Sequence, residues 1–520
     1  MGARRELLNR FATDFIGLDR VDPVYGGGER RRVYLDTTAT ALMPRVVWDG
    51  IREYLQCASA NSHTDAHRAG RDTTKAIEDS RDAIGRLVGY NCASDVVLFT
   101  ANGATGATNF LARALFPPEL RAVIKRFPDG APQSFIATLD KCLGTAGAGV
   151  IDELLARPMV VASAMEHHSN LLPWMEAVGK QNVCAARVDP DTGGLDLDDL
   201  GRILTAHGDK IRLVAVTAVS NVTGVLNPVH KIARMAHEIG AQVLIDGAQW
   251  VPHAPVKMHT GDPAEDIDYL VLSGHKLYAP GSRGALVGSL STLSSKRCVT
   301  DVGGGMVEYV SIEDFEVKEQ VTAREEAGTP NIPGSIAMGV IAETLMLIGM
   351  DVIAEAEHEM TTLLVDRLAA VDGVEVYGST DVKTVPRAGV VAFNVEGLYH
   401  GLVAAYLNDY HNIAVRNGCF CAQPYAKALL RVDHETEMSY RADMMCGDRR
   451  NLPGMVRASL GVYSTVADID ALCAALAQLH QERDTIAPQY RPDLNGTYRR
   501  VDGTALPITF SVADFVRSAL

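Results

Sequence analysis

Two cysteines stand one residue apart in the stretch "RNGCFCAQP", which covers residues 416–424. Cys419 and Cys421 fit three descriptions: a metal clip, a redox couple, or two small thiols that pack in a core. Most intracellular cysteines only pack. The pair alone leaves its chemistry open, so its role depends on the other reactive side chains of the chain.

Polar side chains follow several predicted strands at the points where the strands end. They are His167 and His168 in "MEHHSN", Asn221 in "SNVTG", Asp246 and Gln249 in "IDGAQ", and Ser273, His275 and Lys276 in "SGHK". Each one singly fits a turn or a helix cap. In open α/β sheets, however, ligands bind beyond the carboxyl ends of the strands. We therefore ask which single ligand would need the whole set.

Pyridoxal phosphate is a ligand with these requirements. It needs a lysine for a Schiff base, an acid beside the pyridinium nitrogen, a donor to the phenolate oxygen, and a phosphate cradle. Lys276, Asp246, Gln249 and the Ser273/His275 pair fill these roles in turn. The set therefore predicts a pyridoxal-phosphate site.

Two further segments complete the predicted cofactor site. His167 is the candidate for a ring that stacks on the cofactor. The segment "NGATGAT" (102–108) lies between a strand and a helix, so the backbone N–H groups of Ala104 and Thr105 would face the phosphate at a helix N-terminus. A glycine-rich turn is weak evidence alone, and it gains weight from the other residues.

Short β-branched runs alternate with helical patterns, which predicts a parallel sheet built from βαβ units. Candidate strands are 95–100, 159–164, 211–220, 241–248, 269–274 and 284–289, and candidate helices are 73–90 and 229–240. After about residue 300, a long helix from Ser335 and a strand at 388–397 predict a smaller α+β domain. We expect an N-terminal segment (1–30), a large domain (31–305), a small domain (306–487) and an extension (488–520).

Composition narrows the class of protein. The chain has 520 residues, 47% of them hydrophobic, and a net charge of −15, which argues against a nucleic-acid partner. The start has no apolar leader, and the most apolar later stretch is interrupted by Glu343 and Asp351, so we expect neither secretion nor a membrane span. The nine cysteines lack a framework spacing. We expect a cytoplasmic enzyme with free thiols and no metal.

The chain also resembles a known family, the class V, fold-type I pyridoxal-phosphate enzymes, and among them the group II cysteine desulfurases and selenocysteine lyases. The similar segments are "YLDTTATALMP" (34–44), "NSHTDAHRAG" (61–70), "GAT" (103–105), "EHHSNLLPW" (166–174), "SNVTGVLNPV" (220–229), "DGAQ" (246–249), "SGHKLYAPGSRG" (273–284), "GGGM" (303–306), "EEAGTPN" (325–331), "RNGCFCAQP" (416–424) and "VRASLGVYSTVADID" (456–470). The resemblance implies an α/β fold with a mainly parallel seven-stranded sheet in the large domain and a smaller α+β C-terminal domain.

The resemblance also implies an activity, conversion of L-cysteine to L-alanine with a persulfide left on the enzyme. Cys421 falls on the catalytic cysteine of the family, while Cys419 occupies a position commonly held by histidine and is expected to be structural. Arg457 and Asn221 would bind the substrate. Selenocysteine is a second substrate that the family accepts.

Other family features follow from the same resemblance. Lys276 would move the substrate Cα proton, and His167, with a pKa expected near neutrality, would shuttle the thiol proton. Thr329 of the "AGTPN" loop would reach the phosphate of a neighbouring subunit, so a homodimer is expected. A sulfur-acceptor protein is a further partner that such an activity needs.

Alternatives remain at this point. A class V carbon–sulfur lyase, epimerase or aminotransferase would keep Lys276 and not depend on Cys421, and a non-enzymatic binding module would need neither. Departures from the family are the long segments 106–165 and 422–456, Gly106 where many relatives carry Glu, and the tail 488–520.

Overall fold

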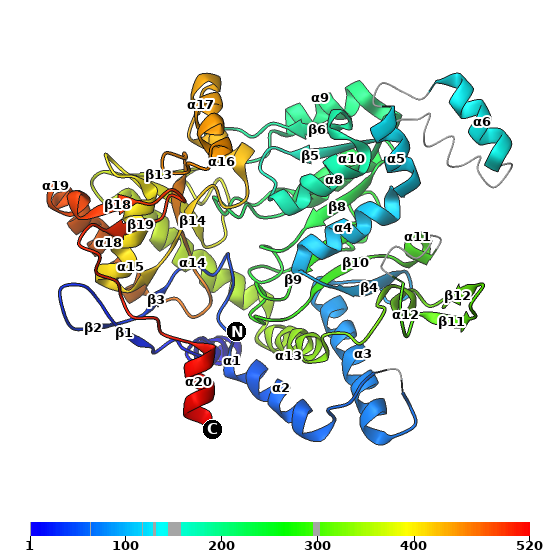
Figure 1. Ribbon diagram of the computed structural model, residues 1–520, viewed down its shortest axis with the longest axis horizontal. Coiled ribbons are helices and arrows are strands. Elements are labelled where there is room, and N and C mark those ends of the chain that lie inside the picture. The colour runs from blue at the N-terminus through cyan, green and yellow to red at the C-terminus, as the bar shows by residue number, and fades with distance from the viewer. Residues whose placement is uncertain (1, 63, 117, 128–131, 144–157, 295–301) are drawn as a thin grey trace.

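The computed structural model of the chain describes residues 2–62, 64–116, 118–127, 132–143, 158–294 and 302–520. Figure 1 shows two lobes, a large one built on a wide sheet and a small one that carries C-terminal elements. The large sheet has seven strands in the order β4-β10-β9-β8-β7-β5-β6. Its strands are β4 (Asp95–Thr100), β5 (Met159–Ser163), β6 (Val183–Ala186), β7 (Ile211–Thr217), β8 (Gln242–Asp246), β9 (Tyr269–Ser273) and β10 (Gly284–Ser289).

All strands of this sheet run in one direction except β10, which is antiparallel to both β9 and β4. The mainly parallel seven-stranded sheet predicted from the sequence is confirmed. β6 was not among the candidate strands. It lies at the sheet edge and buries only Ala186, so it lacks the apolar run by which a covered strand is found.

Alternate residues of each strand face opposite layers of helices. Val97 and Phe99 of β4 belong to one core, and Val96 and Leu98 of the same strand belong to a second core. The helices of the first core are α3 (Arg68–Val88), α10 (Val229–His237) and α13 (Ile332–Ile348), and those of the second are α4 (Gly103–Leu115) and α8 (Leu172–Val178). This period-two alternation covers both faces of the sheet, so only its ends remain for a ligand.

The small lobe contains an antiparallel sheet with the order β13-β14-β17-β16. Its elements are β13 (Val374–Val376), β14 (Val390–Val395), β16 (Arg416–Gly418), β17 (Met455–Ser459), α14 (Met350–Ala369), α15 (His400–His411) and α18 (Val466–Gln481). The predicted strand at 388–397 is β14. In the pairing of β16 with β17, Arg416 lies opposite Arg457, and β16 leads directly into Cys419. Sheet register therefore sets where the cysteine pair lies relative to Arg457.

The predicted division of the chain into domains stays a prediction. α13 packs in the core of the large sheet, and α14 follows it after an 81° bend at Gly349, whose φ is +98°. Within the described residues, no single helix is both long and apolar enough to cross a membrane.

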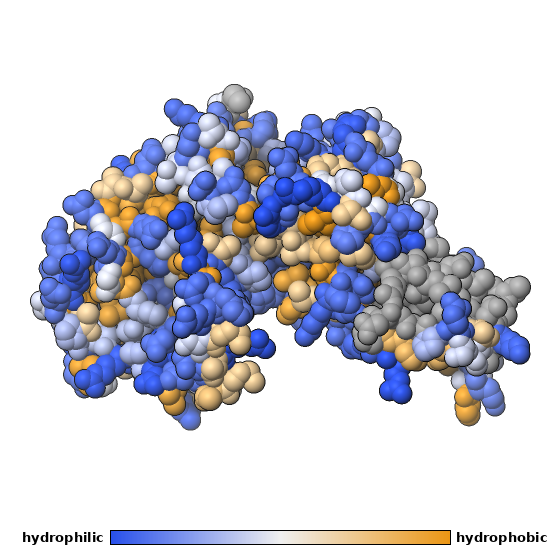
Figure 2. Space-filling model, turned by 90° about the horizontal axis from the view of Figure 1, so that it is seen from above, coloured by the Kyte–Doolittle hydropathy of each residue, from blue (hydrophilic) through white to orange (hydrophobic). Residues whose placement is uncertain are grey.

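The two long segments and the tail carry elements of their own. These are α5 (Pro118–Arg126), α6 (Gln133–Leu143), α16 (Gln423–Leu429), α17 (His434–Met445), β18 (Tyr490–Pro492), β19 (Tyr498–Arg500) and α20 (Val512–Ala519), and α19 (Arg483–Ile486) directly precedes the tail. Residues 117, 128–131 and 144–157 of the first segment lie outside the described residues. α17 projects at the top of Figure 1, and Figure 2, viewed from that side, shows a molecule hollowed between its lobes.

The remaining elements connect or flank the two lobes. They are α1 (Gly2–Ala12), β1 (Val21–Pro23), β2 (Glu29–Arg31), β3 (Val33–Tyr34), α2 (Arg45–Cys57), α9 (Leu197–His207), α11 (Leu290–Ser294), β11 (Val307–Val310), β12 (Phe315–Val317), α12 (Val321–Glu325) and β15 (Ile413–Ala414). β3 and β15 pair in parallel, which joins the N-terminal part of the chain to the small lobe.

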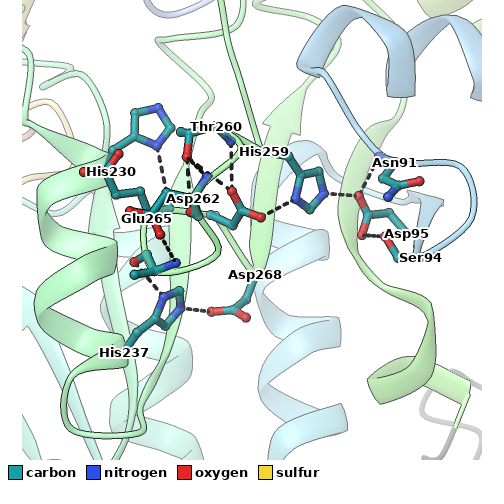
Figure 3. A network of polar contacts seen from close by, with 12 residues as sticks. Asn91, Ser94, Asp95, His230, His237, His259, Thr260, Asp262, Glu265 and Asp268 are labelled. Carbon is teal, nitrogen blue, oxygen red and sulfur yellow. Dashed lines mark hydrogen bonds and ion pairs between the residues drawn. The ribbon is translucent and has the colours of Figure 1, made fainter.

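A polar network lies at the amino ends of β4, β8 and β9 (Figure 3). His259 contacts Asp95 Oδ2 through Nε2 at 2.7 Å and Asp266 Oδ2 through Nδ1 at 2.9 Å. Burial opposes a charged ring, but the two carboxylates outweigh it and raise the pKa of His259. His237 makes a similar contact with Asp268 at 2.9 Å. The network therefore holds the side of the sheet where these strands begin. The predicted ligand residues lie on the opposite side, at the carboxyl ends of the strands.

This network predicts a pH-dependent stability. The folded-state pKa of His259 is raised. Its contribution to the free energy of unfolding is therefore complete below the unfolded-state pKa of about 6.5, and it is lost as the pH rises through the folded-state pKa. The pKa of Asp266 is lowered, so the contribution of Asp266 to the free energy of unfolding is lost only in acid, below about pH 4. Urea unfolding of wild type and His259→Gln should differ most between about pH 5 and 6 and converge above neutrality. The same substitution at exposed His358 should give no such pH dependence, and equal curves for wild type and His259→Gln would contradict the assignment.

Candidate active site

A cavity of about 210 Å³ lies at the carboxyl ends of the parallel strands and is closed on one side by the small lobe. The structure brings most of the predicted site residues to its walls. They are Ala104, Thr105, His167, Asn221, Asp246, Ser273, His275, Lys276, Cys421 and Arg457. Gln249 is buried beside it, whereas Thr329 is exposed and does not line the cavity of its own chain.

The N-terminus of α4 forms one wall. Asn102 precedes it with a φ of +58°, its first residue Gly103 has a φ of +64°, and Ala104 N–H donates to Ser273 Oγ at 2.9 Å. The turn also explains Gly106, because a Cβ on this residue would lie 1.7 Å from Ala101 O. A helix start that presents N–H groups and a serine hydroxyl suits an anion such as a phosphate.

Lys276 and Asp246 form the charged floor of the cavity. Burial lowers the pKa of Lys276 to about 8, although the charge of Asp246 opposes this shift. Burial also raises the pKa of Asp246, against the charge of Lys276 and a hydrogen bond of 2.9 Å from Ala248 N–H. An amine with this pKa can lose its proton near neutrality, as covalent attachment of a carbonyl compound requires.

His167 lies on the wall contributed by the segment that follows β5. Its Nδ1 accepts from Ser169 N–H at 3.1 Å, and Ser169 Oγ in turn contacts Thr105 Oγ1 at 2.6 Å. Burial, with help from the charge of Lys276, lowers the pKa of His167 to about 3. The expected pKa near neutrality is therefore wrong. The ring is neutral, and since Nδ1 accepts, its proton is on Nε2.

Arg457 is held rigidly in the wall that faces Lys276. Its Nη1 donates to Asn221 O at 2.9 Å, its Nη2 pairs with Asp36 at 3.1 Å, and its guanidinium covers the Phe420 ring at 4.9 Å. Burial lowers the pKa of Arg457 to about 10. An oriented guanidinium of this kind suits bidentate binding of a carboxylate.

The segment with the two cysteines is clamped to the lip of the cavity. Phe420 and Cys421 have φ of +53° and +56°, a left-handed conformation that costs about 1–2 kcal/mol for each such residue. Asn221 Nδ2 donates to Phe420 O at 2.8 Å, and His168 N–H donates to Cys421 O at 2.7 Å. Cys421 is an exposed free cysteine and lines the cavity. These contacts therefore hold Cys421 in an uncommon backbone shape at the cavity.

Cys419 has different surroundings. It is partly buried, its Sγ donates to Pro453 O at 3.1 Å, and burial raises its pKa. Within the described residues, no cluster of three or more His, Cys, Asp or Glu side chains could hold a metal. The two cysteines therefore differ in exposure and bonding, while the structural role of Cys419 stays a prediction.

Sequence reasoning did not single out several residues of the cavity. Four of them, Thr38, Ser169, Arg416 and Phe420, line the cavity, and the fifth is Asp36, which pairs with Arg457. Ser169 lies two residues from His167, and Arg416 and Phe420 lie inside the cysteine motif, so proximity in sequence was a usable signal for these three. Asp36 is separated from Arg457 by 421 positions, and only the fold brings the two together.

The donor set fits pyridoxal phosphate. The cavity offers a partly buried amine, a buried carboxylate and a helix N-terminus, three of the four groups that this cofactor needs. Gln249 donates through Nε2 to Thr38 O at 2.9 Å and keeps a second amide hydrogen, while Gln249 Oε1 and Arg457 Nε are buried and have no hydrogen-bond partner among the residues that the structure describes. Unpaired buried polar atoms beside the cavity indicate a polar ligand.

A mainly parallel seven-stranded sheet with a smaller α+β lobe, and a lysine and an aspartate at the ends of adjacent strands, define a fold-type I pyridoxal-phosphate enzyme. The aminotransferase class-V family matches residues 33–127 and 141–472. The chain belongs to this family.

Similar proteins agree with this assignment. A probable cysteine desulfurase from Halalkalibacterium halodurans is 32% identical over 446 residues, which are 85% of this chain and 92% of that protein. The apo structure of a cysteine desulfurase from Thermococcus onnurineus NA1 is similar with a TM-score of 0.68 and 28% identity, over 86% of this chain and 95% of that one. The Escherichia coli cysteine desulfurase CsdA, with a TM-score of 0.64 and 26% identity, has the same coverage of 86% and 95%.

Proposed function

We propose that the chain is a pyridoxal-phosphate-dependent cysteine desulfurase, which converts L-cysteine to L-alanine and retains the sulfur as a persulfide on Cys421. The observation that carries the proposal is the exposed thiol of Cys421, clamped at the mouth of the cavity that also contains Lys276 and Arg457. A lyase, an epimerase or an aminotransferase would have no use for a thiol in this place.

The cofactor would be held by groups at the strand ends. Lys276 would attach it, Asp246 would face its ring nitrogen, and Gln249 would donate to its phenolate oxygen. The phosphate would lie against Ala104, Thr105, Ser273 and His275, which form the wall at the start of α4. The flat, neutral ring of His167 would stack on one face of the cofactor ring. The burial of His167 in the cavity wall allows this position.

The substrate would be bound by its carboxylate. The Arg457 guanidinium is already oriented by Asp36 and by the backbone of Asn221, so little side-chain freedom is lost on binding. The Asn221 side chain holds the Phe420 carbonyl, which joins substrate binding to the position of the adjacent Cys421.

Pyridoxal phosphate supplies an electron sink through its protonated ring. Lys276 Nζ, with its pKa near 8, would accept the substrate Cα proton and return it. The Cys421 thiolate would attack the substrate sulfur, so that an S–S bond forms as the C–S bond breaks, and protonation of the carbon product gives alanine. His167 would act as a donor through Nε2–H and not as a cation.

We further propose a cytoplasmic homodimer that hands its sulfur to an acceptor protein. Two observations support the dimer. Glu326 pairs with Arg81 at 2.6 Å and with Arg283 at 3.1 Å, which fixes the base of the loop that carries exposed Thr329. The adjacent β11–β12 hairpin exposes Tyr309, Val310, Ile312 and Phe315, an apolar surface that a second subunit would cover.

The dimer predicts a stable assembly in which each cofactor site includes a residue of the partner subunit. Sedimentation at nanomolar protein should still show a dimer, since interfaces of obligate homodimers commonly bury 2,000 Å² or more. Thr329→Ala should weaken pyridoxal-phosphate binding about tenfold without changing the sedimentation coefficient, because a single phosphate hydrogen bond is lost. The exposed Thr260→Ala variant serves as the control, and a fully active monomer would contradict the proposal.

The function is tested by incubating the purified, cofactor-loaded protein with L-cysteine and a reducing thiol. A desulfurase forms alanine and sulfide in equal amounts. Pyruvate and ammonia in place of alanine would instead assign the chain to the carbon–sulfur lyases, and the absence of sulfide from L-cysteine would refute both.

A further inference from the structure

Carbonyl groups of one short segment form a row behind the cysteine pair. This segment, residues 449–454, ends the long 422–456 segment and precedes β17. Leu452 O accepts from His400 Nε2 at 3.0 Å and from the Tyr399 hydroxyl, and Pro453 O accepts from Cys419 Sγ at 3.1 Å. Residues 449–454 are therefore hydrogen-bonded both to the start of α15 and to the Cys419 thiol.

Close packing makes this support rigid. A Cβ at Gly454 would meet His400 Nε2 at 2.7 Å and Gly418 Cα at 2.8 Å. His400 is buried, and its Nδ1 accepts from Asn417 Nδ2 of β16 at 3.1 Å. Displacement of residues 449–454 would thus be passed to β16 and to the residues that follow it.

The C-terminal extension holds the same segment from outside. Its hairpin, formed by β18 and β19 (residues 490–500), places Leu494 O against Arg449 N–H at 2.9 Å. The Tyr498 ring stacks on the Tyr399 ring, with centroids 5.7 Å apart and planes at 28°.

The hairpin is anchored in turn on α15. Arg500 Nη1 donates to Tyr410 Oη at 2.6 Å, and the Tyr490 hydroxyl donates to Asp409 Oδ2 at 2.9 Å. These bonds fix the hairpin to the same helix whose first residues hold the carbonyl row. The extension is therefore a fixed part of the small lobe up to about residue 500.

We propose that the hairpin 490–500 is a positioning element for Cys421, which acts through residues 449–454 and Cys419. The proposal rests on the proposed function, in which Cys421 carries the sulfur. Phe420 and Cys421 both have left-handed backbones, which persist only where the surroundings enforce them. Asn221 and His168 hold this turn from the cavity side, and the hairpin supports it from the opposite side.

The test uses the full-length, cofactor-loaded protein with Tyr498→Ala, and Tyr498→Phe as the conservative variant that keeps the stacked ring. In Tyr498→Ala, amide exchange in the peptide 416–424 should become about tenfold faster. The kcat for alanine formation should fall about 10-fold while KM stays within about twofold, because the thiol is misplaced but the Arg457 site is intact. Tyr498→Phe should behave as wild type in both measurements.

A truncation after Leu506 is the matched control, since it removes α20, which has no buried residue, and leaves the hairpin in place. It should change neither measurement. Wild-type exchange of residues 416–424 in Tyr498→Ala would overturn the proposal, and if that variant does not fold, Tyr498→Leu tests the same contact. A wild-type protein that forms no alanine would refute the proposed function alone, because the exchange measurement does not depend on turnover.

Discussion

Lys276→Ala should lose the visible absorption band of bound pyridoxal phosphate and all measurable conversion of L-cysteine, a fall of at least about 10³-fold. Under the proposed function the Lys276 Nζ is both the point of attachment and the proton carrier, and among the described residues no second lysine lines the cavity. Absorbance spectra of both proteins, together with borohydride reduction and peptide mass spectrometry of the wild type, check the result. The reduced cofactor should be found on Lys276.

Exposed Lys257 gives the matched control for this experiment. Lys257→Ala should keep the band and the activity. A variant Lys276→Ala with an unchanged band would show that the cofactor is attached elsewhere, and it would overturn the assignment of the strand-end residues as one site.

Cys421→Ala should keep the cofactor band, because attachment of the cofactor needs no thiol, while sulfide release from L-cysteine falls by about 10³-fold. Cys419→Ala should lose no more than about tenfold, since this residue contributes a single S–H donor behind the loop. Alanine and sulfide assays on both variants, each with its spectrum, make the comparison.

The two cysteines thus serve as controls for each other. A metal clip would instead make the two losses equal, because each thiol would supply a ligand that the site requires. Equal losses, or full sulfide release by Cys421→Ala, would place the chain among the family members that do not transfer sulfur to a cysteine.

The floor of the site was predictable because it depends on strand ends. Asp246 ends β8 and Ser273 ends β9, and neighbouring parallel strands finish on the same side of the sheet, so the last residues of the predicted strands identify side chains that the structure brings to one cavity. The strands of the large sheet were predictable from their apolar runs, except for β6. Only one residue of β6 is buried, so its sequence has no apolar run to detect.

The upper part of the site was not predictable in this way. The pairing of Asp36 with Arg457 and the support of Cys419 by Pro453 join segments that only the tertiary packing of the chain brings together, both of them beside the small-lobe sheet. The pKa of His167 also depends on that packing, because an imidazole has a pKa near 6.5 until neighbours exclude water from it. Residue type predicted the presence of these side chains but not their protonation or partners.

The position of Cys421 has a kinetic consequence under the proposed function. Lys276 and Asp246 are enclosed while the Cys421 thiol is exposed, so sulfur can leave the protein without opening the chamber where carbon chemistry takes place. The enzyme that carries a persulfide on Cys421 must then pass this sulfur to an acceptor before it can convert a second amino acid. Steady-state velocities with varied L-cysteine and varied acceptor should therefore give parallel double-reciprocal lines, the pattern of a double-displacement enzyme.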